Sequence, residues 1–155
     1  MLNTLTGNII GEDSGPGFVT LEINGVGYCV FVVGRTEVPR SEAPGSVVRA
    51  PRKFYIHENI VAAQQGPSKY DLYGFETQEE RRLFRALISE CEGVGPSTAM
   101  KAMNISPPEQ LLQAIRLGNE KYLERGVGTR TAARIILGLG KYAAAEAVTK
   151  TKELV

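Results

Sequence analysis

The sequence has no tryptophan, one histidine and two cysteines, Cys29 and Cys91, among its 155 residues. With one histidine and no paired cysteine spacing, a zinc site is not expected, and a disulfide is the less favoured interpretation in a reducing compartment. No apolar run approaches the roughly 20 residues that span a bilayer. Residues 1–4 also lack the basic and then apolar pattern of a signal peptide. These absences indicate a cytoplasmic protein.

Charge of either sign is not in excess, since the net charge is only +1. Basic residues outnumber acidic ones between residues 97 and 141, so a nearly neutral chain can still carry one basic face. A solvated surface of mixed charge explains these counts equally well. The charge count alone therefore does not decide between the two interpretations.

The first 75 residues are typical of β-structure. Asn24-Gly25, between two apolar runs, is a strong signal for a hairpin with a type I′ turn. Five short strands predict a small closed barrel of the OB type, because an open sheet of this size would leave its edges exposed. The expected strands, rich in Val, Ile, Phe and Tyr, lie at residues 5–10, 18–23, 28–33, 47–56 and 70–75.

After residue 75 the apolar periodicity becomes helical. Thr77 and Glu80 fit a capping box at a helix start, and Ser106, followed by two prolines, predicts a second helix start by the same logic. A third helix is expected from Thr129 into Tyr142. The predicted class is α+β, with an OB-fold barrel at residues 1–75, an all-α domain with two helix-hairpin-helix motifs at 76–142, and a C-terminal tail or the start of a linker at 143–155.

A repeated glycine motif is the most informative feature of the sequence. Gly-Val-Gly-Pro-Ser-Thr-Ala at residues 93–99 is echoed by Gly-Val-Gly-Thr-Arg-Thr-Ala at 126–132. Each copy is expected between two helices, and two copies in the same context are much stronger evidence than one. Neither copy completes the dinucleotide-binding pattern or follows a strand, and neither has the lysine and hydroxyl ending of a P-loop.

The chemistry of such a turn favours phosphate binding. Glycine lets the backbone turn tightly without a side chain in the way, and the amides of the next helix start point outward at the positive end of its dipole. The alternative is that the glycines only allow tight helix packing. The expected DNA-binding residues are Gly93, Val94, Gly95, Ser97, Thr98, Lys101, Gly126, Val127, Gly128, Thr129, Arg130, Thr131 and Arg134.

The order and spacing of these motifs resemble the RuvA family, the Holliday-junction-binding subunits of bacterial branch-migration complexes. Besides the two glycine repeats, the resemblance rests on Ile-Asn-Gly-Val-Gly-Tyr at 23–28 and Leu-Tyr-Gly-Phe at 72–75. It implies non-catalytic binding of four-way junction DNA by a homotetramer, possibly an octamer, in recombination, repair and the SOS response. A RuvB-type motor and a RuvC-type resolvase are the implied partners, with no cofactor and no membrane.

The chain departs from the family pattern in several places. Ser97 and Thr129 stand where lysines are usual, which should weaken DNA binding. Glu58 matches an acidic pin at the junction centre, although Asn59 replaces the usual second acid and an ordinary exposed acid is an equal alternative. Residues 60–70 make this hairpin longer than usual. The family's motor-docking domain has no counterpart before Val155, so motor docking by this chain is doubtful.

Two other interpretations remain open at this point. An enzyme would need a placed nucleophile or a carboxylate cluster, but aspartate is limited to Asp13 and Asp71, and no catalytic or metal-binding residue is expected. A general duplex-binding or protein-interaction module that has lost junction specificity is the second. The apolar stripe of the first helix forms either part of the tetramer contact or the interior of its own subunit; it comprises Leu83, Phe84, Leu87 and Ile88.

Overall fold

A computed structural model describes residues 1–39 and 49–153 of the chain. The first two residues of the strand predicted at 47–56 lie outside these residues. The sequence Pro44-Gly45, which is typical of a turn before that strand, lies outside them as well. The chain divides into two compact units, Met1–Arg81 and Arg82–Val155.

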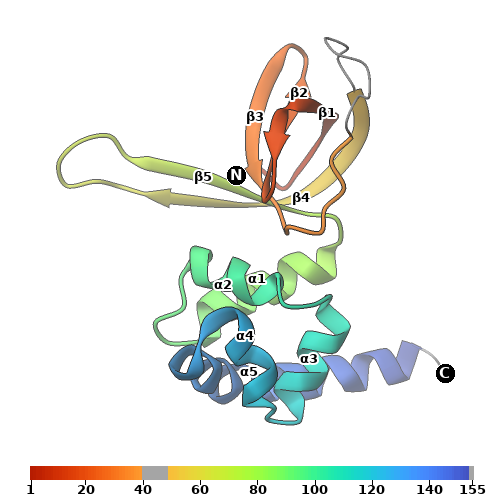
Figure 1. The fold of residues 1–155 in the computed structure, drawn as a ribbon, viewed down its shortest axis with the longest axis vertical. Helices are drawn as coiled ribbons and strands as arrows, with labels where there is room; N and C mark the ends of the chain where they lie inside the picture. The colour runs from red at the N-terminus through yellow and green to blue at the C-terminus, as the bar shows by residue number, and fades with distance from the viewer. Residues whose placement is uncertain (40–48, 154–155) are drawn as a thin grey trace. The chain divides into compact units, whose positions relative to one another are not determined.

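The first unit is a closed five-stranded barrel, as the sequence predicted (Figure 1). Neighbouring strands pair antiparallel except β3 and β5, whose short parallel pairing at Val30–Leu72 and Phe31–Tyr73 closes the barrel. The strands follow one another around the barrel in the order β1-β2-β3-β5-β4. Their bounds are β1 Thr4–Gly15, β2 Phe18–Ile23, β3 Val26–Phe31, β4 Arg49–Val61 and β5 Lys69–Phe75.

Alternating apolar side chains fill the barrel interior, because successive residues of a strand point to opposite faces. Asn24 and Gly25 have φ values of 50° and 78°, which confirms the hairpin between β2 and β3 and the positive φ of its turn. Strand β1 continues to Gly15, five residues beyond its predicted end, through an irregular register after Ile10. The core comprises Leu5, Ile9, Val19, Leu21, Val30, Val32, Phe54, Ile56 and Leu72.

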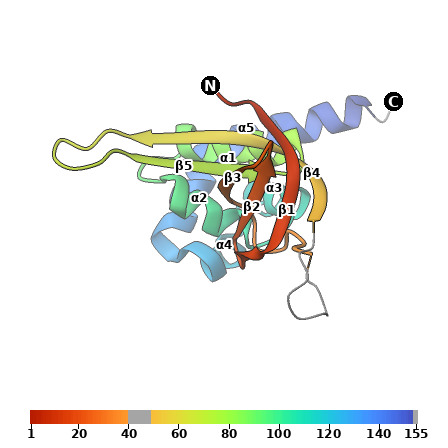
Figure 2. The same ribbon diagram turned by 90° about the horizontal axis from the view of Figure 1, so that it is seen from above.

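Strands β4 and β5 continue past the barrel as a two-stranded hairpin (Figures 1 and 2). The pairing of β4 with β1 ends at Tyr55, whereas its pairing with β5 runs on to Val61. Ile60, Val61 and Tyr70 are 64%, 51% and 51% exposed, because no third strand among residues 1–39 and 49–153 pairs with this part of the hairpin. The outer half of this hairpin therefore depends on its own cross-strand pairs.

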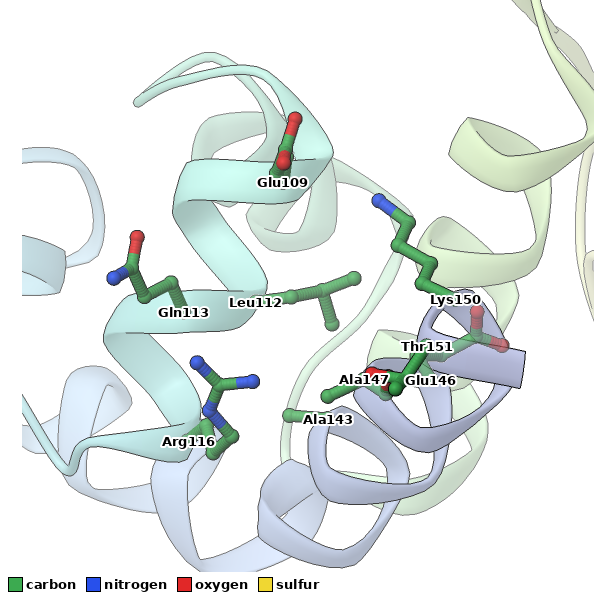
Figure 3. Close-up of a pocket in the computed structure, with 9 residues that line it drawn as sticks. All are labelled: Glu109, Leu112, Gln113, Arg116, Ala143, Glu146, Ala147, Lys150 and Thr151. Atoms are coloured by element: carbon green, nitrogen blue, oxygen red, sulfur yellow. The ribbon is translucent and has the colours of Figure 1, made fainter. Parts of the chain in front are cut away.

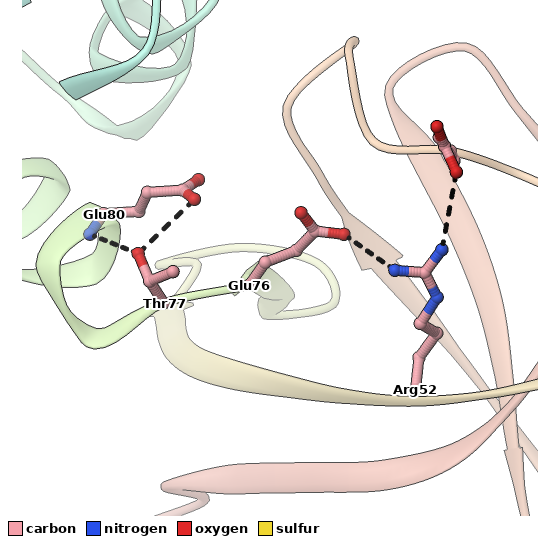
Figure 4. Close-up of polar contacts among 5 residues, drawn as sticks. Arg52, Glu76, Thr77 and Glu80 are labelled. Carbon is pink, nitrogen blue, oxygen red and sulfur yellow. Dashed lines mark hydrogen bonds and ion pairs between the residues drawn. The ribbon is translucent and has the colours of Figure 1, made fainter. Parts of the chain in front are cut away.

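The junction between strand and helix carries the predicted cap (Figure 4). The Glu80 amide donates to Thr77 Oγ1 at 3.2 Å, and that hydroxyl lies 3.4 Å from the Glu80 carboxylate. The Arg52 guanidinium of β4 bonds Glu76 at 3.1 Å. The helix therefore starts where the capping box predicted.

The second unit is helical, and no helix among the described residues is long and apolar enough to cross a bilayer. Two details differ from the sequence predictions. The last helix does not end near Tyr142 but continues to Glu153, and Ser106 does not cap α3, whose N-cap is Pro107 while the Ser106 hydroxyl is buried without a partner. The helices are α1 Gln78–Glu90, α2 Pro96–Met103, α3 Pro108–Arg116, α4 Glu120–Val127 and α5 Thr129–Glu153.

Candidate nucleic-acid interface

The first glycine repeat forms the turn between α1 and α2. Gly93 is exposed and has a φ of +74°, in the left-handed region that favours glycine. Val94 is only 5% exposed and anchors the turn to the helical core. Gly95 is the N-cap of α2, with an extended backbone and open space where a Cβ would stand. In this turn, therefore, only Gly93 has a backbone conformation that favours glycine.

The second repeat has the same Gly-Val-Gly triplet but a different backbone. Gly126 and Val127 form the last residues of α4, and the positive φ falls on Gly128, at +81° with ψ at 168°. This combination is essentially restricted to glycine. A Cβ on Gly126 would lie 2.4 Å from Ile105 Cγ1, so this glycine is required for packing instead.

Each turn leads directly into a helix whose first amides lack helical acceptors. The helical bonding of α2 begins with Ala99 N–H to the Gly95 carbonyl at 2.9 Å, and that of α5 with Ala132 N–H to Gly128 at 3.0 Å. No side chain caps the start of α2. Proline at position 96 leaves α2 two unpaired amides, on Ser97 and Thr98, whereas the first turn of α5 has amides on Thr129, Arg130 and Thr131.

The two repeats contact each other reciprocally. A Cβ on Gly93 would lie 2.5 Å from the Arg134 guanidinium of α5, and one on Gly126 would lie 3.0 Å from the Lys101 carbonyl of α2. Gly93 and Gly126 occupy matching positions in the two repeats, as do Lys101 and Arg134. Each turn thus packs against the second helical turn of the other repeat, which ties both predicted sites into one helical unit.

Cations surround these turns. Lys101 and Arg130 are exposed, and Arg134 is half-buried against Gly93. Arg125, which precedes the second repeat, lies with Lys101 and Gly126 around one groove and was not predicted. No local sequence signal points to Arg125, because it stands outside both repeats and comes near Lys101 only through helix packing.

Glu58, the predicted pin, is engaged within its own chain. The Leu2 backbone N–H donates to Glu58 Oε1, and the Tyr70 hydroxyl donates to Oε2 at 3.1 Å. The Leu2 bond in particular lowers the pKa of the Glu58 carboxyl below its ordinary value. The carboxylate therefore ties the first residues of the chain to the β4–β5 hairpin.

The apolar stripe of α1 packs inside its own chain. Leu83, Phe84 and Leu87 are fully buried, and Ile88 is half-buried. Leu83, Phe84 and Leu87 are therefore not available for the suggested tetramer contact. Burial inside the subunit, the other expectation for this stripe, accounts for these three side chains.

Cys91 lies directly before the first glycine turn. A Cβ on Gly138 of α5 would lie 2.9 Å from Cys91 Sγ, so the helix approaches this thiol very closely. Burial raises the pKa of the Cys91 thiol to about 11. Cys29 is exposed, and both cysteines are free.

A second hollow of about 290 Å³ lies between α3 and the C-terminal half of α5 (Figure 3). Leu112 and Ala143 form apolar parts of its wall, while Arg116 and Glu146 place opposite charges at its edge. Glu146 also pairs with Arg82 at 3.7 Å. Because acids and bases are mixed here, this hollow does not have the uniform charge of a phosphate site. Within residues 1–39 and 49–153, no three His, Cys, Asp or Glu side chains are grouped so as to hold a metal ion.

No family model matches the chain, but several curated proteins are similar to it. Proteins named Holliday junction branch migration complex subunit RuvA from Bacillus thuringiensis, Bacillus mycoides and Bacillus anthracis are each 36% identical to it over 146 residues. The match covers 92% of this chain but 64% of each relative, so the chain spans just under two thirds of their length. The chain, whose described residues form an OB-like barrel followed by helices, is similar to these RuvA subunits over most of its own length.

Proposed function

We propose that the two glycine turns are helix-hairpin-helix motifs that bind the sugar–phosphate backbone of DNA. The observation that carries the proposal is the pair of helix starts, each of which follows a glycine turn with an exposed glycine directly before the helix. Amides at such a start, with the positive end of the helix dipole, favour a phosphate oxygen. Ser97, Thr98 and Thr131 add hydroxyl donors, and Arg130 and Arg134 add charge.

The preferred DNA is a four-way junction. Similarity to relatives named as Holliday junction subunits supports this choice, as does the duplication of the turn, since two turns can hold one duplex arm at two points. Contacts of this kind position a protein on DNA without reading its sequence. The chain therefore recognises the shape of the junction and carries out no chemistry on it.

Four copies of the chain in cyclic arrangement match the four arms of a junction. We propose this homotetramer, with a RuvB-type motor as the partner of the assembled family complex. Light scattering of the free chain and of its junction complex measures the stoichiometry. Four chains on each junction are expected, and one chain on each junction would contradict the assembly.

The function is tested by comparing the affinity of the chain for a four-way junction and for a linear duplex of the same arm sequence, at one fixed salt concentration. We expect the junction to bind at least tenfold more tightly. Equal affinities would make the chain a general duplex-binding protein. No complex with either DNA at low salt would contradict DNA binding altogether.

A further inference from the structure

A groove of about 400 Å³ lies between the end of α2 and the end of α4. Lys101, Asn104 and Ile105 line it from α2 and the residues that follow, and Arg125 and Gly126 line it from α4. All five belong to the helical unit. The groove thus adjoins the second glycine turn without being part of either helix start.

The charge of this groove has one sign. Its two ionisable residues, Lys101 and Arg125, are both cations and both exposed. Neither forms an ion pair with an acid in the part of the chain that the structure describes. Two cations that share a concave site without a neutralising acid attract an anion to it.

Arg125 is held in place rather than free in solvent. Its guanidinium carbon lies 4.3 Å from the centre of the Tyr122 ring, and its Nε donates to the Tyr122 carbonyl at 3.2 Å. These contacts use one of its five N–H groups and leave the terminal ones for a ligand. A fixed planar guanidinium loses less entropy on binding an oxyanion than a mobile one.

The floor of the groove is apolar and close-packed. Ile105 packs so tightly against Gly126 that a Cβ there would lie 2.4 Å from Ile105 Cγ1. Ile105 is half-buried and leaves part of its surface open. Two charged walls and an apolar floor match a phosphate attached to a sugar better than a free inorganic ion.

We infer that this groove binds a backbone phosphate of DNA between Lys101 and Arg125, in addition to the phosphates held at the two glycine turns. The inference rests on the proposed function and extends it, because Arg125 and Tyr122 belong to neither repeat. Both cations bind the same phosphate. Tyr122 acts as a positioning residue that orients Arg125.

The test measures junction affinity for the full chain over a salt series, with Lys101→Gln, Arg125→Gln and the double variant. Each phosphate neutralised contributes about 0.9 to the slope of log affinity against log salt. The double variant should therefore lose about 0.9 for each chain bound to the junction, or about 3.6 for four chains, and its loss of affinity should be smaller than the product of the two single losses. A loss of about 1.8 for each bound chain would mean two separate phosphates and would overturn the shared site.

Arg116→Gln is the matched control, because Arg116 is an exposed cation on α3 that lies outside this groove. Tyr122→Leu should weaken binding severalfold with an unchanged salt slope, because the charge of Arg125 remains while the aromatic ring against its guanidinium is removed. If the unaltered chain binds the junction but Arg125→Gln behaves as Arg116→Gln does, the groove is not a site. If the unaltered chain binds no DNA, the proposed function itself fails.

Discussion

Replacing Gly95 with valine should separate DNA binding from folding. Gly95 is the N-cap of α2, with φ at −96° and ψ at −178°, an extended conformation that valine adopts easily, and its Cβ would meet nothing within 4 Å. Valine caps a helix less well than glycine, by roughly 0.5–1 kcal/mol. It also restricts the unfolded chain, which stabilises by about 0.4–1 kcal/mol. These effects offset, so the free energy of unfolding should change by less than about 0.5 kcal/mol.

Junction affinity, by contrast, should fall clearly when Gly95 is replaced with valine. On the proposed binding mode, the new methyl groups would occupy the open space beside Gly95 and hold a phosphate away from the Ser97 and Thr98 amides. Loss of one hydrogen bond to a charged group costs about 1.5 kcal/mol or more, which corresponds to roughly tenfold or more in junction affinity. Denaturant unfolding and junction titration of the same sample measure the two effects.

Two other glycines serve as comparisons. Gly128→Val should lower both the stability and the junction affinity, because φ of +81° with ψ of 168° costs a valine about 1–3 kcal/mol. Gly140→Val adds the same side chain into open space within α5, and it should change neither the stability nor the junction affinity greatly. If Gly95→Val bound the junction as tightly as the unaltered chain, the first turn would not be in contact with DNA.

Three further predictions concern other parts of the chain. A thiol reagent at pH 8 should modify exposed Cys29 rapidly and Cys91 only after unfolding, since its pKa is raised to about 11; equal rates in the folded protein would contradict this burial. The pKa of Glu58 is lowered in the folded chain, so its carboxylate should keep the bond to the Leu2 amide at any pH above the usual pKa of a glutamate. The bond should be lost when the pH falls through the lowered pKa and the carboxylate is protonated. The pH dependence of the Leu2 amide shift in an NMR titration measures the pKa of Glu58, and a midpoint at the ordinary glutamate value of 4.5 or higher would contradict the lowered pKa. Thr77→Ala should destabilise the folded state by about 1 kcal/mol in denaturant unfolding, whereas Thr77→Ser should retain the cap, and equal losses would show that the hydroxyl is not needed.

Local sequence signals predicted the barrel and the helical half well. The hairpin at Asn24-Gly25 and the cap at Thr77 follow from turn and capping chemistry that involves only a few neighbouring residues. Features set by distant residues were missed. The parallel closure of the barrel by β3 and β5, and the bond from Leu2 to Glu58 across 56 positions, have no local sequence signal.

The glycine repeats show a further limit of sequence analysis. Both copies read Gly-Val-Gly, yet the positive φ falls on the first glycine at Gly93 and on the last at Gly128. The helix before each turn decides this, since α1 ends at Glu90, before its repeat, whereas α4 continues through Val127. Identical triplets therefore differ in backbone because their preceding helices end at different points.

We propose above all that the two helix starts present main-chain amides to DNA phosphates. Backbone amide NMR of the chain, with and without a four-way junction, tests it residue by residue. The largest shifts are expected at Ser97, Thr98, Arg130 and Thr131. If these amides stayed unchanged while others moved on binding, the glycine turns would not be the DNA-binding surface.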